Sequence, residues 1–289
     1  MFKKEIKRAK TVIEALPYLR EFHNKIVVIK YGGSAMIDPE LKTNLLRDVV
    51  FLKLAGMHPV IVHGGGPEIS KRLKRKKIES HFVQGLRVTT KEVMKIVEYV
   101  LGNRVNREIC SLIKKHGGKA KGFYGAKGCV IKAHKHMVKA ENGNYIDLGY
   151  TGSVAGIRYR LLNKWIKKGY IPVLSPIGVG PRGKSYNINA DSAAAAIASH
   201  LNAVKLILLT DVRGVMDKEG ELVSEIDASH IKRMIKRKVI KGGMIPKVQC
   251  CLQALGHGVE QVHILDGQIP HVLLLELFTN RGIGTMVVK

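Results

Sequence analysis

The chain has 289 residues, of which 45% are hydrophobic, so it can bury the core of one large domain or of two intimate ones. It contains no run of 18 apolar residues, which argues against a transmembrane helix and a membrane partner. Its formal net charge of +26 implies a basic surface, and a basic surface of this kind attracts anionic ligands.

The excess of positive charge is partly gathered into clusters, and two explanations of it stay open. The clusters are "KKEIKRAK" near the N-terminus, "KRLKRKK" at 71–77 and "IKRMIKRKVIK" at 231–241. A nucleic-acid-binding surface uses such clusters, but these lack interleaved aromatic side chains for base stacking. We therefore favour a compositional bias that places lysine on solvated helix faces, with no nucleic-acid partner.

The segment 1–24 is predicted to form an amphipathic helical arm. Ile6, Ala9, Ile13 and Leu16 share one face at helical spacing, and Pro17 should kink or end the helix. Such an arm either folds back on its own domain or packs on another subunit. The segment has no uninterrupted apolar stretch of the kind found in secretory signals, and it carries three glutamates. We therefore expect a cytoplasmic location, or the plastid stroma if the chain is plastid-encoded.

The four cysteines form no C-x-x-C pair, which indicates reduced thiols in a reducing compartment and no structural metal.

From residue 25 onward, strand and helix patterns alternate. Near-continuous apolar strands are expected within 25–33, 57–66, 169–178, 204–214 and 259–267. Helical patterns lie at 39–56, 67–77, 90–118, 190–202 and 245–258, with Pro67 and Pro246 suited to first turns and Gly256 to a C-cap. This alternation predicts an α/β fold: a three-layer αβα sandwich around a mainly parallel sheet, plus the N-terminal arm.

The middle of the chain, 129–157, has weaker alternation and an Asn142-Gly143 turn signal, which predicts an antiparallel hairpin or lid. We place a domain boundary near Ser175. The expected division is then the arm (1–24), an N-terminal lobe (25–175) and a C-terminal lobe (176–289).

Two glycine-rich turns that follow predicted strands are candidates for binding phosphate. They are Lys30-Tyr31-Gly32-Gly33 and Gly64-Gly65-Gly66, the second running into a helix. Glycine lets the backbone approach an anion closely, and helix N-termini present free N–H groups. Tight turns between strands and helices also use glycine for structural reasons alone, so each turn by itself is a moderate signal.

The stretch "GVGPRGKS" at 178–185 matches the P-loop pattern but not its structural context. A P-loop helix begins at the Lys-Ser pair, whereas Ser185 is followed by "YNINA", which reads as an extended segment. The next helix should begin near Asp191, and Pro181 lacks the N–H group that such a loop needs. We therefore interpret the match as accidental.

Six motifs then appear in order: "IKYGGSAM", "VIVHGGGPEIS", "GLRVT", "YNINADSAAAAIA", "LILLTDVRGV" and "GGMIPKV". Over 25–288 the chain resembles the amino acid kinase family, in particular its N-acetylglutamate kinase members. The resemblance implies the amino acid kinase fold and ATP-dependent phosphorylation of N-acetyl-L-glutamate to N-acetyl-L-glutamyl 5-phosphate in arginine biosynthesis. The alternatives are a sister kinase acting on glutamate, aspartate or carbamate, and a non-catalytic basic binding module.

The resemblance also implies roles for individual residues. Lys30 and Lys247 would stabilise the transferring phosphoryl group, and Asp191 would organise both lysines. The substrate would be bound by Gly65, Gly66, Arg87 and Asn187. ATP, with Mg²⁺ on its phosphates and no protein-built metal cage, would be bound by Gly32, Gly33, Thr210, Asp211, Gly214, Lys241 and Met244. The structural alternatives are solvated lysines, an ion pair at Arg87 and a helix-dipole role for Asp191.

Arginine-inhibited members of the family carry a kinked N-terminal helix that links dimers into a hexamer, a trimer of dimers. The arm resembles that helix, and the N-terminal lobe would form the dimer interface. The stretches "HILDG", "LLELFT" and "GIGT" resemble the arginine site, in which Tyr18, His263, Glu276 and Gly282 would contact L-arginine. Plastid and cyanobacterial members bind a PII-type signalling protein, and such a partner stays open here.

Overall fold

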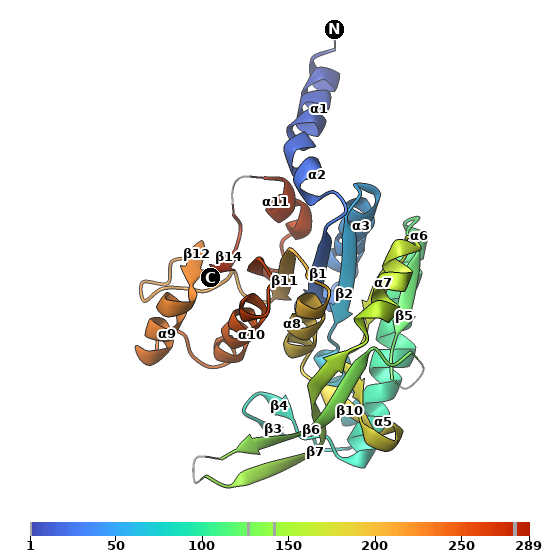
Figure 1. The fold of residues 1–289 in the computed structure, drawn as a ribbon, viewed down its shortest axis with the longest axis vertical. Helices are drawn as coiled ribbons and strands as arrows, with labels where there is room; N and C mark the ends of the chain where they lie inside the picture. Colours follow the sequence, from blue (N-terminus) through green and yellow to red (C-terminus); the bar gives the residue numbers. More distant parts are fainter. Residues whose placement is uncertain (1, 126–127, 141–142, 280–281) are drawn as a thin grey trace.

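The computed structural model describes residues 2–125, 128–140, 143–279 and 282–289. An eight-stranded sheet forms its centre, in the order β12-β14-β13-β11-β1-β2-β8-β5 (Figure 1). Within this sheet only β13 and β14 pair antiparallel. The strands are β1 (Ile26–Tyr31), β2 (His58–His63), β5 (Ala120–Phe123), β8 (Ile171–Leu174), β11 (Lys205–Thr210), β12 (Glu225–Asp227), β13 (Gln261–Asp266) and β14 (Thr285–Val288).

Helices cover both faces of the sheet. One face carries α7 (Tyr159–Lys167), α8 (Ala190–His200), α9 (Ala228–Lys236) and α10 (Met244–Gly256). The other carries α3 (Pro39–Leu54), α4 (Gly66–Arg75), α5 (Lys91–Glu98), α6 (Arg107–Lys115) and α11 (Val272–Phe278). Successive side chains of β1 alternate between the two cores: Val28 packs on the first face, Val27 and Ile29 on the second. The predicted three-layer αβα architecture is confirmed.

The order of the strands creates a crevice at the carboxyl end of β1. The chain leaves β1 toward β2 on one side and later returns through β11 on the other. At such a switch point the connections diverge above and below the sheet, which leaves room for a ligand. Lys30 and Thr210 lie near the ends of these two strands and are both largely buried. The division at Ser175 stays a prediction, because the sheet and both cores continue across the two proposed lobes.

A closed four-stranded barrel lies below the main sheet (Figure 1). Its strands are β6 (Ile131–Lys139), β7 (Tyr145–Ile157), β9 (Ile177–Val179) and β10 (Ser185–Ile188). The pair β6–β7 is antiparallel, so the predicted hairpin is confirmed, although Asn142 of its expected turn lies outside the described residues. A short hairpin, β3 (Phe82–Val83) and β4 (Leu86–Arg87), lies beside it.

The stretch with the P-loop pattern connects two antiparallel strands, β9 and β10. Between them lies a short 3-10 turn, η3 (Pro181–Gly183), and Ser185 already belongs to β10. Helix α8 begins only at Ala190, with the Asn189 side chain accepting hydrogen bonds from the first turn. The expected extended segment is confirmed, and no helix N-terminus is available at Lys184 to form a P-loop.

Two helix predictions need correction. The pattern at 90–118 suggests one helix, but an eight-residue π-helical segment, η2 (Tyr99–Asn106), separates α5 from α6. Its Gly102 packs against Tyr124, and a Cβ atom there would lie only 2.8 Å from the ring. At the end of α10, His257 is the C-cap and Gly258 takes the left-handed conformation (φ +95°) that was expected of Gly256.

The arm consists of α1 (Lys3–Glu14) and α2 (Leu16–Phe22), and the break between them falls where Pro17 was expected to interrupt the helix. Helix α1 extends away from the body of the protein, and none of its residues is buried (Figure 1). In the part of the chain that the structure describes, no helix is both long and apolar enough to cross a membrane.

Candidate active site

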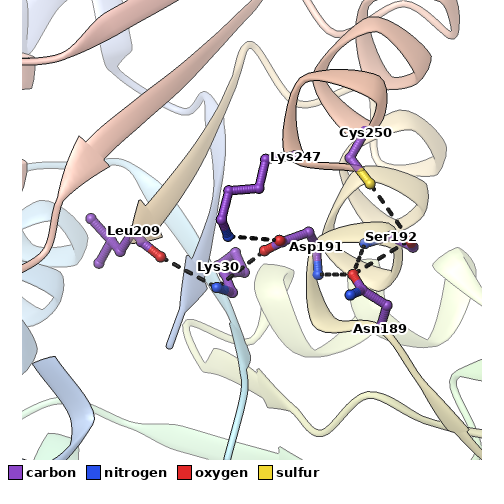
Figure 2. A network of polar contacts seen from close by, with 7 residues as sticks. All are labelled: Lys30, Asn189, Asp191, Ser192, Leu209, Lys247 and Cys250. Carbon is purple, nitrogen blue, oxygen red and sulfur yellow. Dashed lines mark hydrogen bonds and ion pairs between the residues drawn. The ribbon is translucent and has the colours of Figure 1, made fainter. Parts of the chain in front are cut away.

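Three charged side chains that are far apart in the sequence meet at the crevice (Figure 2). Lys30 comes from β1, Asp191 from the first turn of α8, and Lys247 from the first turn of α10. Asp191 Oδ1 lies 3.1 Å from Lys30 Nζ, and Asp191 Oδ2 lies 3.0 Å from Lys247 Nζ. Lys30 also donates to the backbone oxygen of Leu209 on β11, at 3.3 Å. One carboxylate therefore holds two ammonium groups at one place.

The electrostatic environment keeps Asp191 ionised. Burial by itself raises the pKa of this carboxyl, but the charges of Lys30 and Lys247 outweigh that effect and hold the pKa below its ordinary value. A carboxylate with a lowered pKa and a cation on each oxygen is a poor proton acceptor. Asp191 is therefore suited to orienting the lysines and not to acting as a base.

The two glycine turns lie side by side at the ends of β1 and β2. Gly64 donates its N–H to the oxygen of Tyr31 at 2.7 Å, which ties the turns together. Gly65 has φ +153°, and Gly33 has φ +73° with Asp211 so close that a Cβ atom would meet its carboxylate. Both positions therefore require glycine.

Arg87 and Asn187 line one pocket together with Gly64, Gly65 and Gly66, which we call the central pocket. Arg87 donates to the Gly66 oxygen at 3.3 Å and to Ser70 Oγ at 2.8 Å, contacts Ser80 Oγ and stacks on Phe82. Among the described residues no carboxylate forms a salt bridge with it, which argues against the structural ion pair. Burial lowers the pKa of this guanidinium, so a carboxylate from a ligand would stabilise a buried charge that has no acidic partner among the described residues.

The residues expected to bind ATP fall into two groups. Gly32, Gly33, Thr210 and Asp211 lie together where β1 and β11 end, and Gly214 follows with φ +155° against Thr285. Lys241 and Met244 lie at the start of α10, where Lys241 O accepts from Met244 N, one turn before Lys247. Their role in nucleotide binding stays a prediction.

The four residues expected to contact arginine line a second pocket between the arm and the C-terminal strands, which we call the arm pocket. His263 Nδ1 lies 2.6 Å from Glu276 Oε1, while Tyr18 packs edge-on against Phe278 and Gly282 lies at the pocket wall. Sequence reasoning missed Lys205, which lines the same pocket with its Nζ 3.4 Å from His263 Nε2. Lys205 stands at the start of a predicted strand, and nothing in its neighbouring residues indicated a binding role, because its partner His263 is 58 residues away.

The model of the amino acid kinase family matches residues 25–266, and the chain belongs to this family. Among curated proteins it is 50% identical to "Acetylglutamate kinase" of Heliobacterium modesticaldum, over 99% of each chain. It is 51% identical to the protein of the same name from Moorella thermoacetica, over 96% of each chain.

Solved structures share the fold. An N-acetylglutamate synthase from Neisseria gonorrhoeae, complexed with coenzyme A and N-acetyl-glutamate, superposes on 97% of this chain with a TM-score of 0.86 and 24% identity. The chain spans only 63% of the length of that synthase. Carbamate kinase from Giardia lamblia bound to AMP-PNP matches 92% of this chain and 99% of its own, with a TM-score of 0.67 and 16% identity.

Proposed function

We propose that the protein is an acetylglutamate kinase, which transfers the γ-phosphoryl group of ATP to the side-chain carboxylate of N-acetyl-L-glutamate. The products are N-acetyl-L-glutamyl 5-phosphate and ADP, and the reaction serves arginine biosynthesis. The observation that carries the proposal is the pair of ammonium groups, Lys30 and Lys247, held by Asp191 beside two glycine turns. Full-length relatives about 50% identical to this chain bear that name.

The reaction brings two anions together, so the protein must chiefly position reactants and neutralise charge. A carboxylate oxygen of the substrate bonds to the γ-phosphorus while the bond between that phosphorus and the leaving oxygen of ADP breaks. Lys30 and Lys247 approach the transferring group from different elements and offset its charge in the transition state. The substrate carboxylate is already ionised near neutral pH, so no general base is needed.

The substrate would occupy the central pocket. There Arg87 pairs with the carboxylate of the substrate that does not react, Asn187 hydrogen-bonds the amino-acid end, and Gly65 and Gly66 offer N–H groups to the reacting end and the γ-phosphate. Asp211 and the glycines at 32 and 33 lie on the nucleotide side of the crevice.

Mg²⁺ would enter on the ATP phosphates. Within the described residues, no three His, Cys, Asp or Glu side chains gather where they could hold a metal, and Lys30 and Lys247 occupy both oxygens of Asp191. This donor set fits a metal that takes most of its ligands from phosphate and water. When bound, the ion supplies further neutralisation of the phosphate charge.

The test is an assay of ADP release with N-acetyl-L-glutamate, L-glutamate, L-aspartate and carbamate as alternative acceptors. We expect the acetylated substrate to give the highest kcat/KM by far. Equal or better turnover of another acceptor would favour a sister kinase. No phosphorylation of any acceptor, from a folded sample that binds nucleotide, would favour the non-catalytic alternative.

We further propose that L-arginine inhibits the enzyme from the arm pocket. Glu276 offers a carboxylate that matches a guanidinium, and His263 fixes its orientation. Activity is measured with and without millimolar L-arginine, in the wild type and in Glu276→Gln. We expect inhibition of the wild type and a higher arginine concentration for half-inhibition of the variant. Unchanged kinetics of the wild type in arginine would contradict the proposal.

Assembly into hexamers, through α1 and a dimer interface on the N-terminal lobe, is also a proposal, as are a cytoplasmic location and a PII-type partner. The exposure of every residue of α1 supports a role for the arm in subunit contact.

A further inference from the structure

We propose that Thr89 and Thr151 are positioning residues that set the geometry of the substrate site through a pair of buried hydroxyl groups. The inference rests on the proposed function, because it concerns how Arg87 and Asn187 are held for N-acetyl-L-glutamate. Both threonines are almost completely buried, with exposed fractions of 0% and 2%.

The hydroxyl pair joins three segments of the chain. Thr89 follows β4, Thr151 lies in β7 and Asn187 lies in β10, directly opposite Thr151 in the parallel pairing of these strands. Thr151 Oγ1 lies 2.6 Å from the Arg87 oxygen, and Thr89 Oγ1 lies 2.9 Å from the same oxygen. Asn187 Nδ2 lies 3.1 Å from Thr89 Oγ1. The two residues expected to bind the substrate are thus connected through one hydroxyl group.

The backbone holds Thr89 against β7 independently of its side chain. Thr89 N donates to Leu148 O at 2.9 Å, and Tyr150 N donates to Thr89 O at 2.7 Å. Gly149, which lies between Leu148 and Tyr150, has φ +73°, and a Cβ atom there would lie 2.4 Å from Thr89 O. These contacts fix the backbone of Thr89, and the bond to Arg87 O holds its hydroxyl. The hydroxyl can therefore orient a neighbouring side chain.

The number of hydrogen atoms on each group and the distances between them assign a direction to each bond. A threonine hydroxyl has one hydrogen to donate, and the Arg87 oxygen can only accept. Thr89 therefore donates to Arg87 O and accepts from the Asn187 amide. Thr151 has three acceptors within reach and donates to the nearest, Arg87 O at 2.6 Å, ahead of Leu148 O at 3.1 Å and Thr89 Oγ1 at 3.3 Å. It follows that the NH₂ group of Asn187 faces Thr89. The Asn187 Oδ1 atom stays available as an acceptor for the substrate.

The consequence is a defined effect of removing the hydroxyl of Thr89. Thr89→Val keeps the shape of the side chain but takes the acceptor from Asn187 and one donor from Arg87 O. Loss of one buried hydrogen-bond partner corresponds to roughly a tenfold or larger change in affinity. We expect KM for N-acetyl-L-glutamate to rise about tenfold in Thr89→Val, with KM for ATP within about twofold of the wild type.

The experiment compares Thr89→Val, Thr89→Ser, Thr151→Val and the matched control Ser175→Ala. Thr89→Ser retains the hydroxyl and should restore most of the KM. Thr151→Val should have a smaller effect than Thr89→Val, since Arg87 O keeps the hydrogen bond from Thr89. Ser175 is a buried hydroxyl 2% exposed at the end of β8, and its removal should leave both KM values unchanged. Thermal melts of all variants show whether they are folded.

A double-mutant cycle separates positioning from general packing. If Thr89 acts by orienting Asn187, adding Thr89→Val to Asn187→Ala should raise the KM for N-acetyl-L-glutamate little further. If the two residues act independently, the fold-changes in KM of the single variants should multiply in the double variant. Multiplying effects would overturn the proposal, as would equal rises of both KM values or an unshifted KM in Thr89→Val. If Thr89→Val does not fold, Thr89→Ala takes its place. A wild-type KM in Thr151→Val, together with equal KM values in Thr89→Ser and Thr89→Ala, would then overturn the proposal. A folded wild type that does not consume N-acetyl-L-glutamate contradicts the proposed function itself, whereas an active wild type with unshifted variants contradicts only the role of the hydroxyl pair.

Discussion

Lys247 donates a hydrogen bond to Asp191 across the contact between α10 and α8, with 3.0 Å between Nζ and Oδ2 (Figure 2). The bond joins residues that are 56 positions apart. Lys30 reaches the other oxygen of Asp191 from the sheet, so this carboxylate contacts both cations. The positions of two lysines in the site therefore depend on one acidic residue.

Replacing that acid tests its organising role. Asp191→Asn keeps the shape of the side chain but removes the charge that holds two mutually repelling ammonium groups. We expect kcat to fall by at least about 100-fold, the usual cost of losing preorganised charge at a transition state. The measurement is steady-state kinetics, with Glu219→Gln, a surface acid paired with Lys218, as the control. A variant that keeps more than a tenth of the wild-type kcat would contradict the role given to Asp191.

A second prediction concerns the geometry of the guanidinium at Arg87. Lysine keeps the positive charge but not the planar fork that can bind a carboxylate through two parallel bonds. Arg87→Lys should therefore raise KM for N-acetyl-L-glutamate by about tenfold or more, while KM for ATP stays close to the wild-type value. Steady-state titrations of each substrate measure this difference. Equal increases in the two constants would indicate a distorted fold instead of a lost substrate contact.

The parts of the site that sequence could predict are those with a local signal. Lys30 ends an apolar strand beside a glycine pair, and Asp191 opens a helix, so both positions can be located from neighbours in the chain. Lys247 required the resemblance to a family, because its partner comes from another helix. The direction of the Thr89 hydroxyl could not be predicted at all, since it depends on the packing of three segments brought together by β7.

The same limit applies to the fold. Alternation of apolar strands and helical patterns was sufficient to predict the layers, because each pattern reports how a segment buries its own side chains. The π-helical segment Tyr99–Asn106 was not predicted. Helical periodicity gives no information on the tertiary contact in which the Tyr124 ring packs against Gly102.

The third prediction concerns the arm. Helix α1 exposes Ile6, Val12 and Ile13, and its N-cap residue Phe2 is exposed as well. Helix α2 is anchored by the buried Phe22 and by the contact of Tyr18 with Phe278. Deleting residues 1–14 should therefore reduce the mass of the oligomer and leave the fold and the catalytic rate intact. Light scattering coupled to size exclusion measures the mass, and Ile13→Asp should give the same shift in full-length protein. An unchanged oligomer in both variants would mean that the arm does not join subunits.

The last prediction concerns a buried acid outside the site. Asp48 on α3 is 1% exposed and its Oδ1 lies 2.7 Å from Nδ1 of His271, at the start of α11. Burial raises the pKa of this carboxyl to about 6, against the opposing effect of the His271 contact. The unfolded chain should titrate near pH 4, so the folded state binds the extra proton between about pH 4 and pH 6. Stability contributed by this group therefore falls as the pH rises through that range.

Asp48→Asn removes this dependence, because the amide is neutral at every pH. The variant should match the wild type near pH 4 and exceed its free energy of unfolding by about 2 kcal/mol at pH 8, where the wild type buries a charge. Denaturant titrations at several pH values measure the difference, with Glu219→Gln, a change at an exposed carboxylate, as the control. If the variant is instead less stable than the wild type at pH 8, the His271 contact outweighs burial, and the ionised carboxylate of Asp48 is a net stabilising feature of the α3–α11 contact.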